Sequence, residues 1–190
     1  MKITTYCRMG LLAAAAAAVL AAAAPLNAQE RPPRDPATET CESYDQDVRG
    51  DIALLQQEAR QLTSAVDGGA EPPAVEVVRH YAVTLHPQGD VKFVVEPSRV
   101  MLADGSFAGH MSFSVPVTGR YRIGLTSESW VDVLAGGDYL DAAAFSGRVG
   151  CKPLRKLVDY QLDAGKPYVL MLSGGSEEVM GLAIRPVHEG

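Results

Sequence analysis

The residues of this chain that best suit chemistry are its four histidines, because an imidazole can ligate a metal ion or transfer a proton near neutral pH. His80 and His86 are six positions apart, so a regular strand would place both on one face together with Glu76. Two imidazoles and one carboxylate are a typical ligand set for zinc or non-haem iron. A straight strand would, however, separate the two histidines by about 20 Å, so His110 or His188 would have to complete the site. We therefore expect hydrogen-bonded or surface histidines, with a metal site as the alternative.

A metal site of this kind would make the chain a metal-dependent enzyme similar to the cupins, for example a ring-cleaving dioxygenase. The cupin motif combines two histidines two positions apart with a Glu and a Gly at set spacing, and residues 86–90 (HPQGD) do not supply it. Serine catalysis has no better support, because residues 173–176 (SGGS) lack the Gly-x-Ser-x-Gly elbow of hydrolases. The residue types therefore favour a protein that acts by binding.

A second group of residues suited to recognition lies in two segments that contain turn-forming glycines, 104–110 and 130–141. Trp130 is the only tryptophan, and together with Tyr139 it could line a carbohydrate platform, although a lone Trp in a strand belongs more often to the core. Loops on a rigid scaffold commonly carry recognition residues. The predicted binding residues are Asp104, His110, Trp130, Asp132, Asp138 and Tyr139.

Carboxylates in these segments raise the alternative of a calcium cofactor. Asp132, Asp138 and Asp141 surround a Gly-Gly turn, and oxygen-rich loops of this kind can hold Ca²⁺ outside the cytoplasm. The spacing matches no EF-hand loop, and Asp is itself a favoured turn residue. We therefore expect solvated turn acids, with bound Ca²⁺ as the alternative.

The first 28 residues carry the pattern of a secretory signal peptide. Lys2 and Arg8 precede an unbroken apolar run from Leu11 to Ala24, and a short segment ending in Ala28 follows. A membrane-spanning helix would need about 20 apolar residues, so we predict cleavage after Ala28 and a product without a stable membrane anchor. The expected location is periplasmic or secreted.

Removing the signal peptide changes both the charge and the cysteine count. Residues 1–28 contain two basic residues, no acidic residue and Cys7, so the exported chain has a net charge of about −8 and two cysteines, Cys41 and Cys151. An even pair in an oxidising compartment predicts one disulfide bond. The acidic balance argues against a nucleic-acid partner, which requires clustered Lys and Arg. The expected partner is an envelope or extracellular protein or a carbohydrate.

A linker and then a helix are predicted to follow the signal peptide. Residues 29–40 combine prolines with charged residues, a composition typical of a disordered linker. Residues 41–70 form the predicted helical segment, because apolar residues recur at spacings of three and four from Val48 to Val66. We predict a helix from about Tyr44 to Val66 that packs on the chain's own sheet. The same apolar stripe leaves a helix-mediated structural oligomer as an alternative.

From residue 71 the apolar period changes from about 3.6 to 2, which is typical of β-strands. Alternation predicts a hairpin from residues 75–85 and 91–95, and further strands at 111–115, 121–125, 130–134, 154–162, 168–172 and 179–187. Short strands separated by turn residues indicate an antiparallel sandwich. The fold expected for residues 71–190 is mainly β, a jelly-roll-like antiparallel β-sandwich preceded by one N-terminal α-helix.

Two of these strands begin alike, with a turn glycine followed by a Tyr and apolar residues. They are residues 119–125 (GRYRIGL) and 165–172 (GKPYVLML). In these motifs, roughly residues 106–187 resemble the bacterial pre-peptidase C-terminal domains, which are small exported β-sandwiches. The resemblance implies a noncatalytic accessory or binding module and carries over no catalytic residues. The sequence thus predicts an exported, noncatalytic binding protein of the cell envelope.

Overall fold

Alternating apolar residues build two β-sheets in the part of the chain that the computed structural model describes, which comprises residue 35 and residues 38–99 and 104–187. All of these belong to one unit, Arg34–Gly190. The signal peptide and His188 lie outside the described residues, as do residues 29–34, 36 and 37 of the predicted linker. Within the described ranges, no helix has the length and hydropathy needed to cross a membrane.

The elements follow one another mostly as short strands. The helical elements are the 3-10 turn η2 (Cys41–Ser43), the helix α1 (Arg49–Leu55) and the 3-10 turn η3 (Gln88–Asp90). The strands are β1 (Arg60–Thr63), β2 (His80–Thr84), β3 (His86–Pro87), β4 (Phe107–Phe113), β5 (Gly119–Leu125), β6 (Trp130–Ala135), β7 (Asp138–Tyr139), β8 (Ala144–Gly147), β9 (Lys156–Leu162), β10 (Tyr168–Gly175) and β11 (Val179–Pro186).

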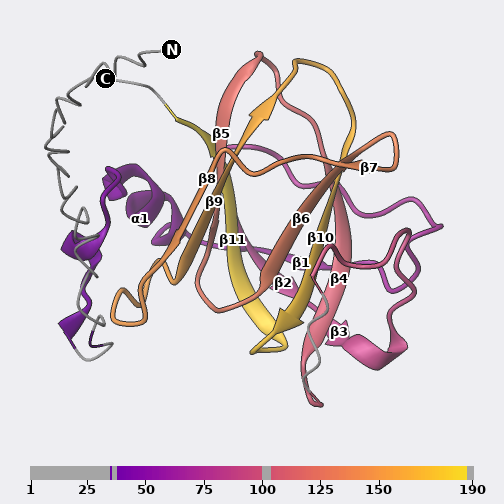
Figure 1. Cartoon of the computed structure of the whole chain (residues 1–190), viewed down its shortest axis with the longest axis horizontal. Coiled ribbons are helices and arrows are strands. Elements are labelled where there is room, and N and C mark those ends of the chain that lie inside the picture. Colours follow the sequence, from indigo (N-terminus) through magenta and orange to yellow (C-terminus); the bar gives the residue numbers. More distant parts are fainter. Residues whose placement is uncertain (1–34, 36–37, 100–103, 188–190) are drawn as a thin grey trace, which may run out of the picture. The chain divides into compact units, whose positions relative to one another are not determined.

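The strands form a six-stranded sheet A with the order β1-β2-β11-β5-β9-β8 and a five-stranded sheet B with the order β3-β4-β10-β6-β7 (Figure 1). Neighbouring strands are antiparallel, except for the parallel pair of β1 and β2. Residues from both sheets alternate into one shared hydrophobic core, which includes Val83, Met111, Ile123, Val133, Leu170 and Leu182. The prediction of a mainly β, sandwich-like fold is therefore confirmed.

The prediction of a continuous helix from Tyr44 to Val66 is wrong. The helix spans only Arg49–Leu55, and residues 60–63 of the same apolar stripe form strand β1. A parallel ladder with β2 satisfies the backbone of β1, and the ring of His80 hydrogen-bonds to the carbonyl of Gln57 at 2.8 Å. Because the unpaired edge of β2 offers these bonds, sheet pairing replaces the local helix. The long helix on which the alternative of a helix-mediated structural oligomer depended is therefore not formed.

The predicted hairpin between residues 75–85 and 91–95 is also not formed. The chain passes from sheet A to sheet B at Leu85, so β2 and β3 belong to different sheets. Residues 91–99, here called the cover segment, form no strand. They cross beside sheet B instead, with Phe93 edge-on to His110 and Ser98 hydrogen-bonded to Asp132. The apolar alternation in this segment therefore reflects packing against a sheet rather than membership of one.

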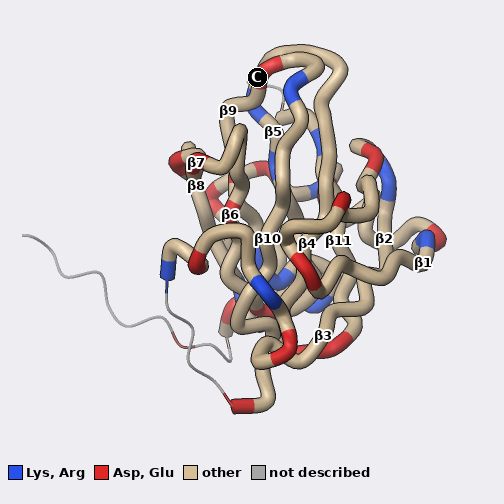
Figure 2. Tube along the Cα trace, turned by 90° about the vertical axis from the view of Figure 1, so that its right-hand side faces the viewer, with Lys and Arg blue, Asp and Glu red and all other residues tan. Residues whose placement is uncertain are grey.

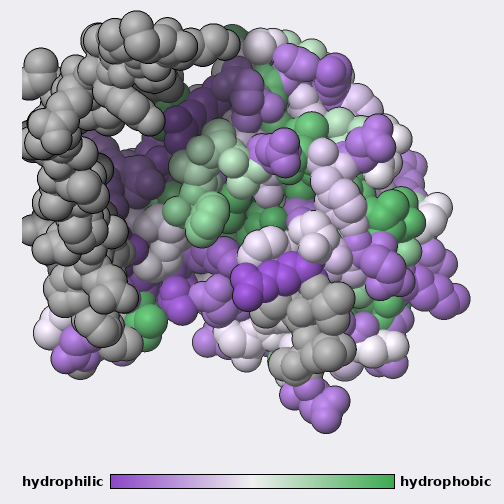
Figure 3. Space-filling view, in the orientation of Figure 1, coloured by the Kyte–Doolittle hydropathy of each residue, from purple (hydrophilic) through white to green (hydrophobic). Residues whose placement is uncertain are grey.

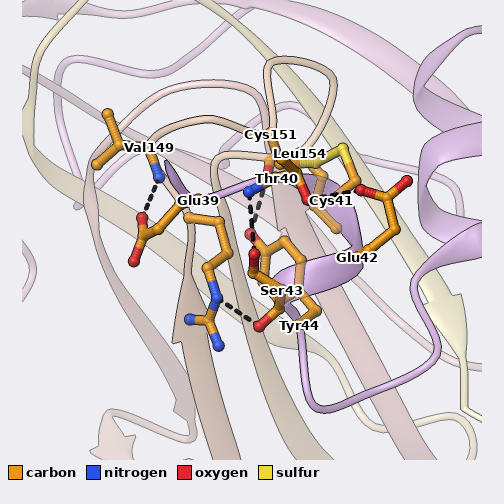
Figure 4. The surroundings of a disulfide bond; sticks show 10 residues. Glu39, Thr40, Cys41, Glu42, Ser43, Tyr44, Val149, Cys151 and Leu154 are labelled. Carbon is orange, nitrogen blue, oxygen red and sulfur yellow. Dashed lines mark hydrogen bonds between the residues drawn. A yellow bond between two sulfur atoms is a disulfide. The ribbon is translucent and has the colours of Figure 1, made fainter. Parts of the chain in front are cut away.

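A second, smaller core lies where the N-terminal cap, residues 38–57, packs on the outer face of sheet A (Figure 1). The predicted disulfide between Cys41 and Cys151 is present and lies in this core (Figure 4). The hydroxyl of Tyr44 donates to the carbonyl of Leu154 at 2.8 Å, and burial raises the pKa of Tyr44 to about 12. Glu39 accepts a hydrogen bond from the backbone of Val149 at 2.8 Å, so the end of the predicted linker is held against the domain.

A buried group of charged residues joins α1 to sheet A. It is here called the charge network and consists of Asp51, Arg120, Arg122, Asp159 and Arg185. Arg122 donates to both oxygens of Asp159, at 2.7 and 3.0 Å, and to Asp51 at 3.2 Å. Burial alone would lower the pKa of Arg122, but the hydrogen bonds and charges of the two aspartates outweigh it and raise the pKa. Elsewhere acidic and basic residues are both spread over the described trace (Figure 2).

Candidate ligand site at the edge of the sandwich

A cavity of about 240 Å³, here called the edge cavity, opens between the outer strands of the two sheets. Strand β7 is the last strand of sheet B on this side, and β8 is the last strand of sheet A. The floor consists of core side chains, namely Val131, Val158 and Tyr160. Three further aromatic side chains, Trp130, Tyr139 and Phe145, line the cavity. The polar side chains that line it are Ser98, Asp132, Asp141 and Lys156.

The cavity exists because the edge strand of sheet B, β7, does not cover the edge strand of sheet A, β8. Phe145 lies opposite Val158 in the β8–β9 ladder, and residues paired in this way project from the same face of a sheet. Val158 projects into the core, so Phe145 projects on the same side. Strand β7 is only two residues long and does not cover it, which leaves Phe145 76% exposed. Hydrophobic surface is visible near β8 in Figure 3.

Trp130 is held in a fixed orientation at this site. Its indole N–H donates to the hydroxyl of Ser98 at 2.9 Å and to the carboxylate of Asp132 at 3.1 Å. The charged groups of Arg99 and Lys156 each lie 5.2 Å from the centre of the indole ring, within range of cation–π attraction. Hydrogen bonds from the indole N–H and cation–π contacts with Arg99 and Lys156 therefore fix the orientation of the ring, which forms a rigid wall of the cavity.

Asp132 is the buried acid that joins the cover segment to β6. Only 6% of the residue is exposed, and its two carboxylate oxygens accept hydrogen bonds from the backbone N–H of Ser98 at 3.1 Å and from the hydroxyl of the same residue. Together with the indole N–H, three donors converge on one carboxylate. Such an acid is suited to holding the wall of a site in place, since a charged group that is buried requires partners of this kind.

Tyr139 forms the opposite lip. Its hydroxyl donates to the carbonyl of Glu96 in the cover segment, and 42% of the residue remains exposed. Burial and the nearby charges of Asp132 and Glu96 raise its pKa, so the phenol stays protonated and acts as a donor. Tyr160 beneath it donates to the carbonyl of Val131 at 3.0 Å, and burial raises its pKa strongly. The floor of the cavity therefore has no unused phenol.

The structure brings together three of the six predicted binding residues, Trp130, Asp132 and Tyr139. Asp138 lies in β7 beside them, but it is exposed and does not line the edge cavity. Asp104 lies in an exposed turn, and His110 is fully buried in β4 beneath the cover segment. The last two therefore do not belong to the site.

Three of the histidines are hydrogen-bonded, as expected, and they share a partner segment that the sequence did not reveal. The rings of His80, His86 and His110 each hydrogen-bond to a backbone carbonyl, at 2.8, 2.8 and 3.2 Å. Those carbonyls belong to Gln57, Ser64 and Ala65, in the segment that holds β1. His80 lies in sheet A and His86 in sheet B, and Glu76 pairs with Arg60 at 2.9 Å. Among the described residues, no three His, Cys, Asp or Glu side chains are grouped as a metal site requires.

The buried imidazole of His110 makes stability depend on pH. Burial lowers its pKa, with the hydrogen bond to Ala65 and the charge of Asp67 opposing the shift. Because the unfolded pKa is higher, about 6.5, the unfolded chain takes up the proton first. Above about pH 6.5 both states hold the imidazole neutral, and burying it costs no stability through protonation. As the pH falls below that value the unfolded chain binds the proton first, so the free energy of unfolding decreases.

We expect the variant His110→Gln to unfold with a weaker pH dependence than the wild type between about pH 7 and 5, the range over which an unfolded histidine becomes protonated. Urea unfolding at several pH values measures the difference between the two proteins, because all other titrating groups are shared. Curves that remain parallel over this range would show that His110 keeps an ordinary pKa.

The predicted binding residues did not include Ser98, Phe145, Lys156 or Tyr160, which also line the edge cavity. Lys156 is close in sequence to Lys152 and Arg155, and three basic residues so close together predict a solvated strand edge. Its side chain is instead 14% exposed and donates to the carbonyl of Ser129 at 2.6 Å. The alternation of β9 gave a signal, since Lys156 shares the inward parity of Val158 and Tyr160.

A wider and shallower groove of about 1060 Å³ lies near residues 74–77, 112–116 and 164–167. Valine, alanine and proline side chains form most of its lining, and among the described residues Glu76 is the one charged side chain that lines it, since Lys166 does not. A binding site needs a few converging polar groups to orient a ligand. The edge cavity meets that requirement better, with two acids, a lysine and a serine hydroxyl beside four aromatic rings.

No protein-family model matches the chain, and no curated protein matches it. Among solved structures, the pre-peptidase C-terminal domain of a collagenase from Bacillus anthracis is similar over 68% of this chain and 98% of that one, with a TM-score of 0.37 and 9% identity. A β-glucosidase from Paenibacillus barengoltzii is similar over 66% of this chain and 13% of that one, with a TM-score of 0.28 and 14% identity. The resemblance to pre-peptidase C-terminal domains expected from the sequence is thus a weak likeness of fold.

Proposed function

We propose that this chain is an exported, noncatalytic binding module of the cell envelope that holds a saccharide in the edge cavity. The observation that carries the proposal is the convergence of Trp130, Tyr139 and Phe145 around one opening, with polar side chains among them. Saccharides present apolar C–H faces and polar hydroxyl edges, and such ligands suit aromatic rings flanked by a few oriented polar groups.

Rigidity supports a binding role for these rings. Trp130 is fixed by Ser98 and Asp132, and Tyr139 is fixed by the cover segment. Side chains that are already ordered lose little conformational entropy when a ligand arrives, so more of the contact energy remains as affinity. Phe145 is the most exposed of these rings, 76% against 42% for Tyr139, and it offers the largest surface that a ligand can cover.

The chemistry of the site favours binding over catalysis. Asp132 already accepts hydrogen bonds from three donors, and the amine of Lys156 is bonded to Ser129 and Glu128. A catalytic acid, base or nucleophile needs a reacting atom within reach and a pKa suited to proton transfer. The hydrogen bonds of Asp132 and Lys156 instead hold the walls of the edge cavity in place.

Export is part of the proposal and rests on two independent features. The leader pattern at residues 1–28 predicts secretion, and the disulfide between Cys41 and Cys151 suits an oxidising compartment. Cytosolic thiols are normally kept reduced, so a structural disulfide is more consistent with the periplasm or the exterior.

Trp130 provides a direct test, because it is the only tryptophan and it lines the cavity. We expect its fluorescence to change when the chain from Gln29 onward is titrated with soluble hexasaccharides of chitin, cellulose and xylan and with solubilised peptidoglycan. At least one of these probes should bind saturably. The variant Phe145→Ala should then weaken binding about tenfold or more, as removal of a central aromatic contact commonly does.

The matched control is Val117→Ala, which shortens another exposed apolar side chain, 66% exposed, outside the edge cavity. It should bind like the wild type. Emission that no probe alters, or a Phe145→Ala affinity equal to that of Val117→Ala, would remove the saccharide site. Unfolding curves for both variants ensure that the comparison is made between folded proteins.

A further inference from the structure

The free edges of the two sheets differ in how well they are protected against pairing with another strand. Strand β1 is flanked by the ion pair of Arg60 and Glu76. Strand β3 has two residues, one of them Pro87, and β7 also has only two. Charged side chains, proline and shortness are the usual means by which proteins block edge-to-edge association.

Strand β8 uses none of these means. Residues 142–147 (AAAFSG), here called the β8 edge, contain no charged residue and no proline. Ala142, Ala143 and Phe145 are exposed, and β8 is the last strand of sheet A among the described residues. The chain bends at Ala143, and Ala144–Gly147 is the extended part of this edge. An uncharged, extended edge is a template on which another strand can pair.

The ladder shows which backbone groups this edge presents. The N–H of Arg148 donates to the carbonyl of Arg155 on the β9 side at 3.0 Å. In an antiparallel ladder the backbone groups of successive residues point to opposite sides, so those of Ser146 also face β9. The N–H of Ala143 also points inward and donates to the carbonyl of Asp159 at 2.7 Å. The backbone groups of Phe145 and Gly147 therefore face away from sheet A, where a further strand would bind.

We propose that the β8 edge pairs with the β8 edge of a second copy of this chain, antiparallel and about a two-fold axis at Phe145. Such an interface is isologous, since the same surface serves both copies. It would join two six-stranded sheets into one continuous sheet and place the two Phe145 rings side by side. The association does not depend on the saccharide proposal.

Charge favours a second copy as the occupant. The exposed Asp141 lies just before the β8 edge. At the other end the guanidinium of Arg155 lies over Gly147, and it also pairs with the carboxylate of Glu128 at 2.7 Å. An antiparallel pair brings the acidic end of each copy towards the basic end of the other, twice in one interface. The residues between these ends carry no charge, so two acidic chains meet there without like charges directly opposite one another.

Two variants and one control test the dimer. The chain from Gln29 onward retains the whole unit Arg34–Gly190 and is examined by sedimentation equilibrium from micromolar to millimolar concentration. We expect a monomer–dimer equilibrium whose dissociation constant rises about tenfold or more in Phe145→Lys, because two lysines would then face each other across the axis. Val117→Lys places the same charge on another exposed valine and should leave the equilibrium unchanged.

The second variant, Phe145→Cys, tests whether the two copies of residue 145 lie directly opposite each other. Directly opposed residues of an antiparallel pair lie about 4.5–5.5 Å apart at Cα, within the range of a disulfide. Because the described cysteines are already bonded to each other, Phe145→Cys should yield a covalent dimer on mild oxidation, whereas Val117→Cys should not. The proposal is overturned if the wild type is monomeric at every concentration, if Phe145→Lys dimerises like Val117→Lys, or if both cysteine variants cross-link equally.

Discussion

Replacing Asp159 with Asn is expected to lower the free energy of unfolding by about 3–5 kcal/mol, the usual cost of breaking one partner out of a buried ion pair. Asp159 is fully buried and accepts hydrogen bonds from Arg120 and from two nitrogens of Arg122. Arg122 is itself only 2% exposed, so it would keep its charge without its main counterion. An amide in place of the carboxylate also turns one acceptor into a donor that faces the guanidinium.

The matched control is the same substitution at an exposed ion pair. Asp163 lies 2.7 Å from Lys166, with more than half of each side chain exposed. Asp163→Asn should cost less than about 1 kcal/mol, because water screens such pairs. Urea unfolding of both variants at neutral pH gives the comparison. Equal losses in the two variants would mean that the charge network adds nothing beyond a surface contact.

A double replacement separates the cost of an unpaired charge from the value of the pair. Arg122→Met combined with Asp159→Leu removes both members and fills the space with apolar atoms. Buried ion pairs replaced in this way often lose little stability. We expect the double variant to be more stable than Asp159→Asn alone, although the contact of Arg122 with Asp51 would be lost as well.

The charge network also illustrates what the sequence could not reveal. Arg122 and Asp159 are 37 positions apart, and only the register of β5 against β9 places them opposite each other. Alternation predicted that both segments are strands. Register and strand order depend on contacts between distant parts of the chain, which a local period does not encode. The fold class could therefore be predicted, whereas the pairing that buries these charges could not.

The helix prediction failed for a related reason. Spacings of three and four from Val48 to Val66 fit one helical face, but Leu62 reaches the core equally well from strand β1. The deciding partner is β2, about 20 positions away, whose edge gives the backbone of Arg60–Thr63 a ladder. Tertiary pairing of this kind overrides a local pattern, particularly at the end of a helix.

The candidate site was predictable where its residues are close in sequence. Trp130 and Asp132 lie on β6 and Tyr139 lies on β7, and the glycines of the turn between these strands marked that segment. Ser98 belongs to the cover segment, which is distant from β6 in sequence. Phe145 lines the cavity because β7, the edge strand of sheet B, does not cover β8, the edge strand of sheet A. These residues depend on where two sheets stop, and hydrophobic alternation carries no information about that.

The largest effect outside the sheets is expected from the disulfide. Cys41 and Cys151 close a loop with a sequence separation of 110 residues. By the chain-entropy model, a cross-link of this span restricts the unfolded chain enough to contribute about 4–5 kcal/mol. Replacing both cysteines with Ala should therefore reduce stability by up to that amount, while the folded structure changes little.

The folded structure should persist because other contacts also hold the N-terminal cap. Arg148 donates to the carbonyl of Ser43 at 2.7 Å, and its guanidinium lies 5.0 Å from the centre of the Tyr44 ring. Leu54 and Leu55 remain buried against sheet A. These contacts act within the native state, whereas the disulfide acts chiefly on the unfolded state.

Urea unfolding with and without reductant measures the two contributions separately. Reductant should lower the stability of the wild type to that of the Cys41→Ala, Cys151→Ala variant and should leave the variant unchanged. Native hydrogen exchange then locates the effect. If the bond acts on the unfolded chain, protection falls evenly in the cap and in core strands such as β5, because both exchange by the same global opening. A loss confined to residues 38–57 would instead show that the disulfide mainly pins the N-terminal cap to an otherwise stable sandwich.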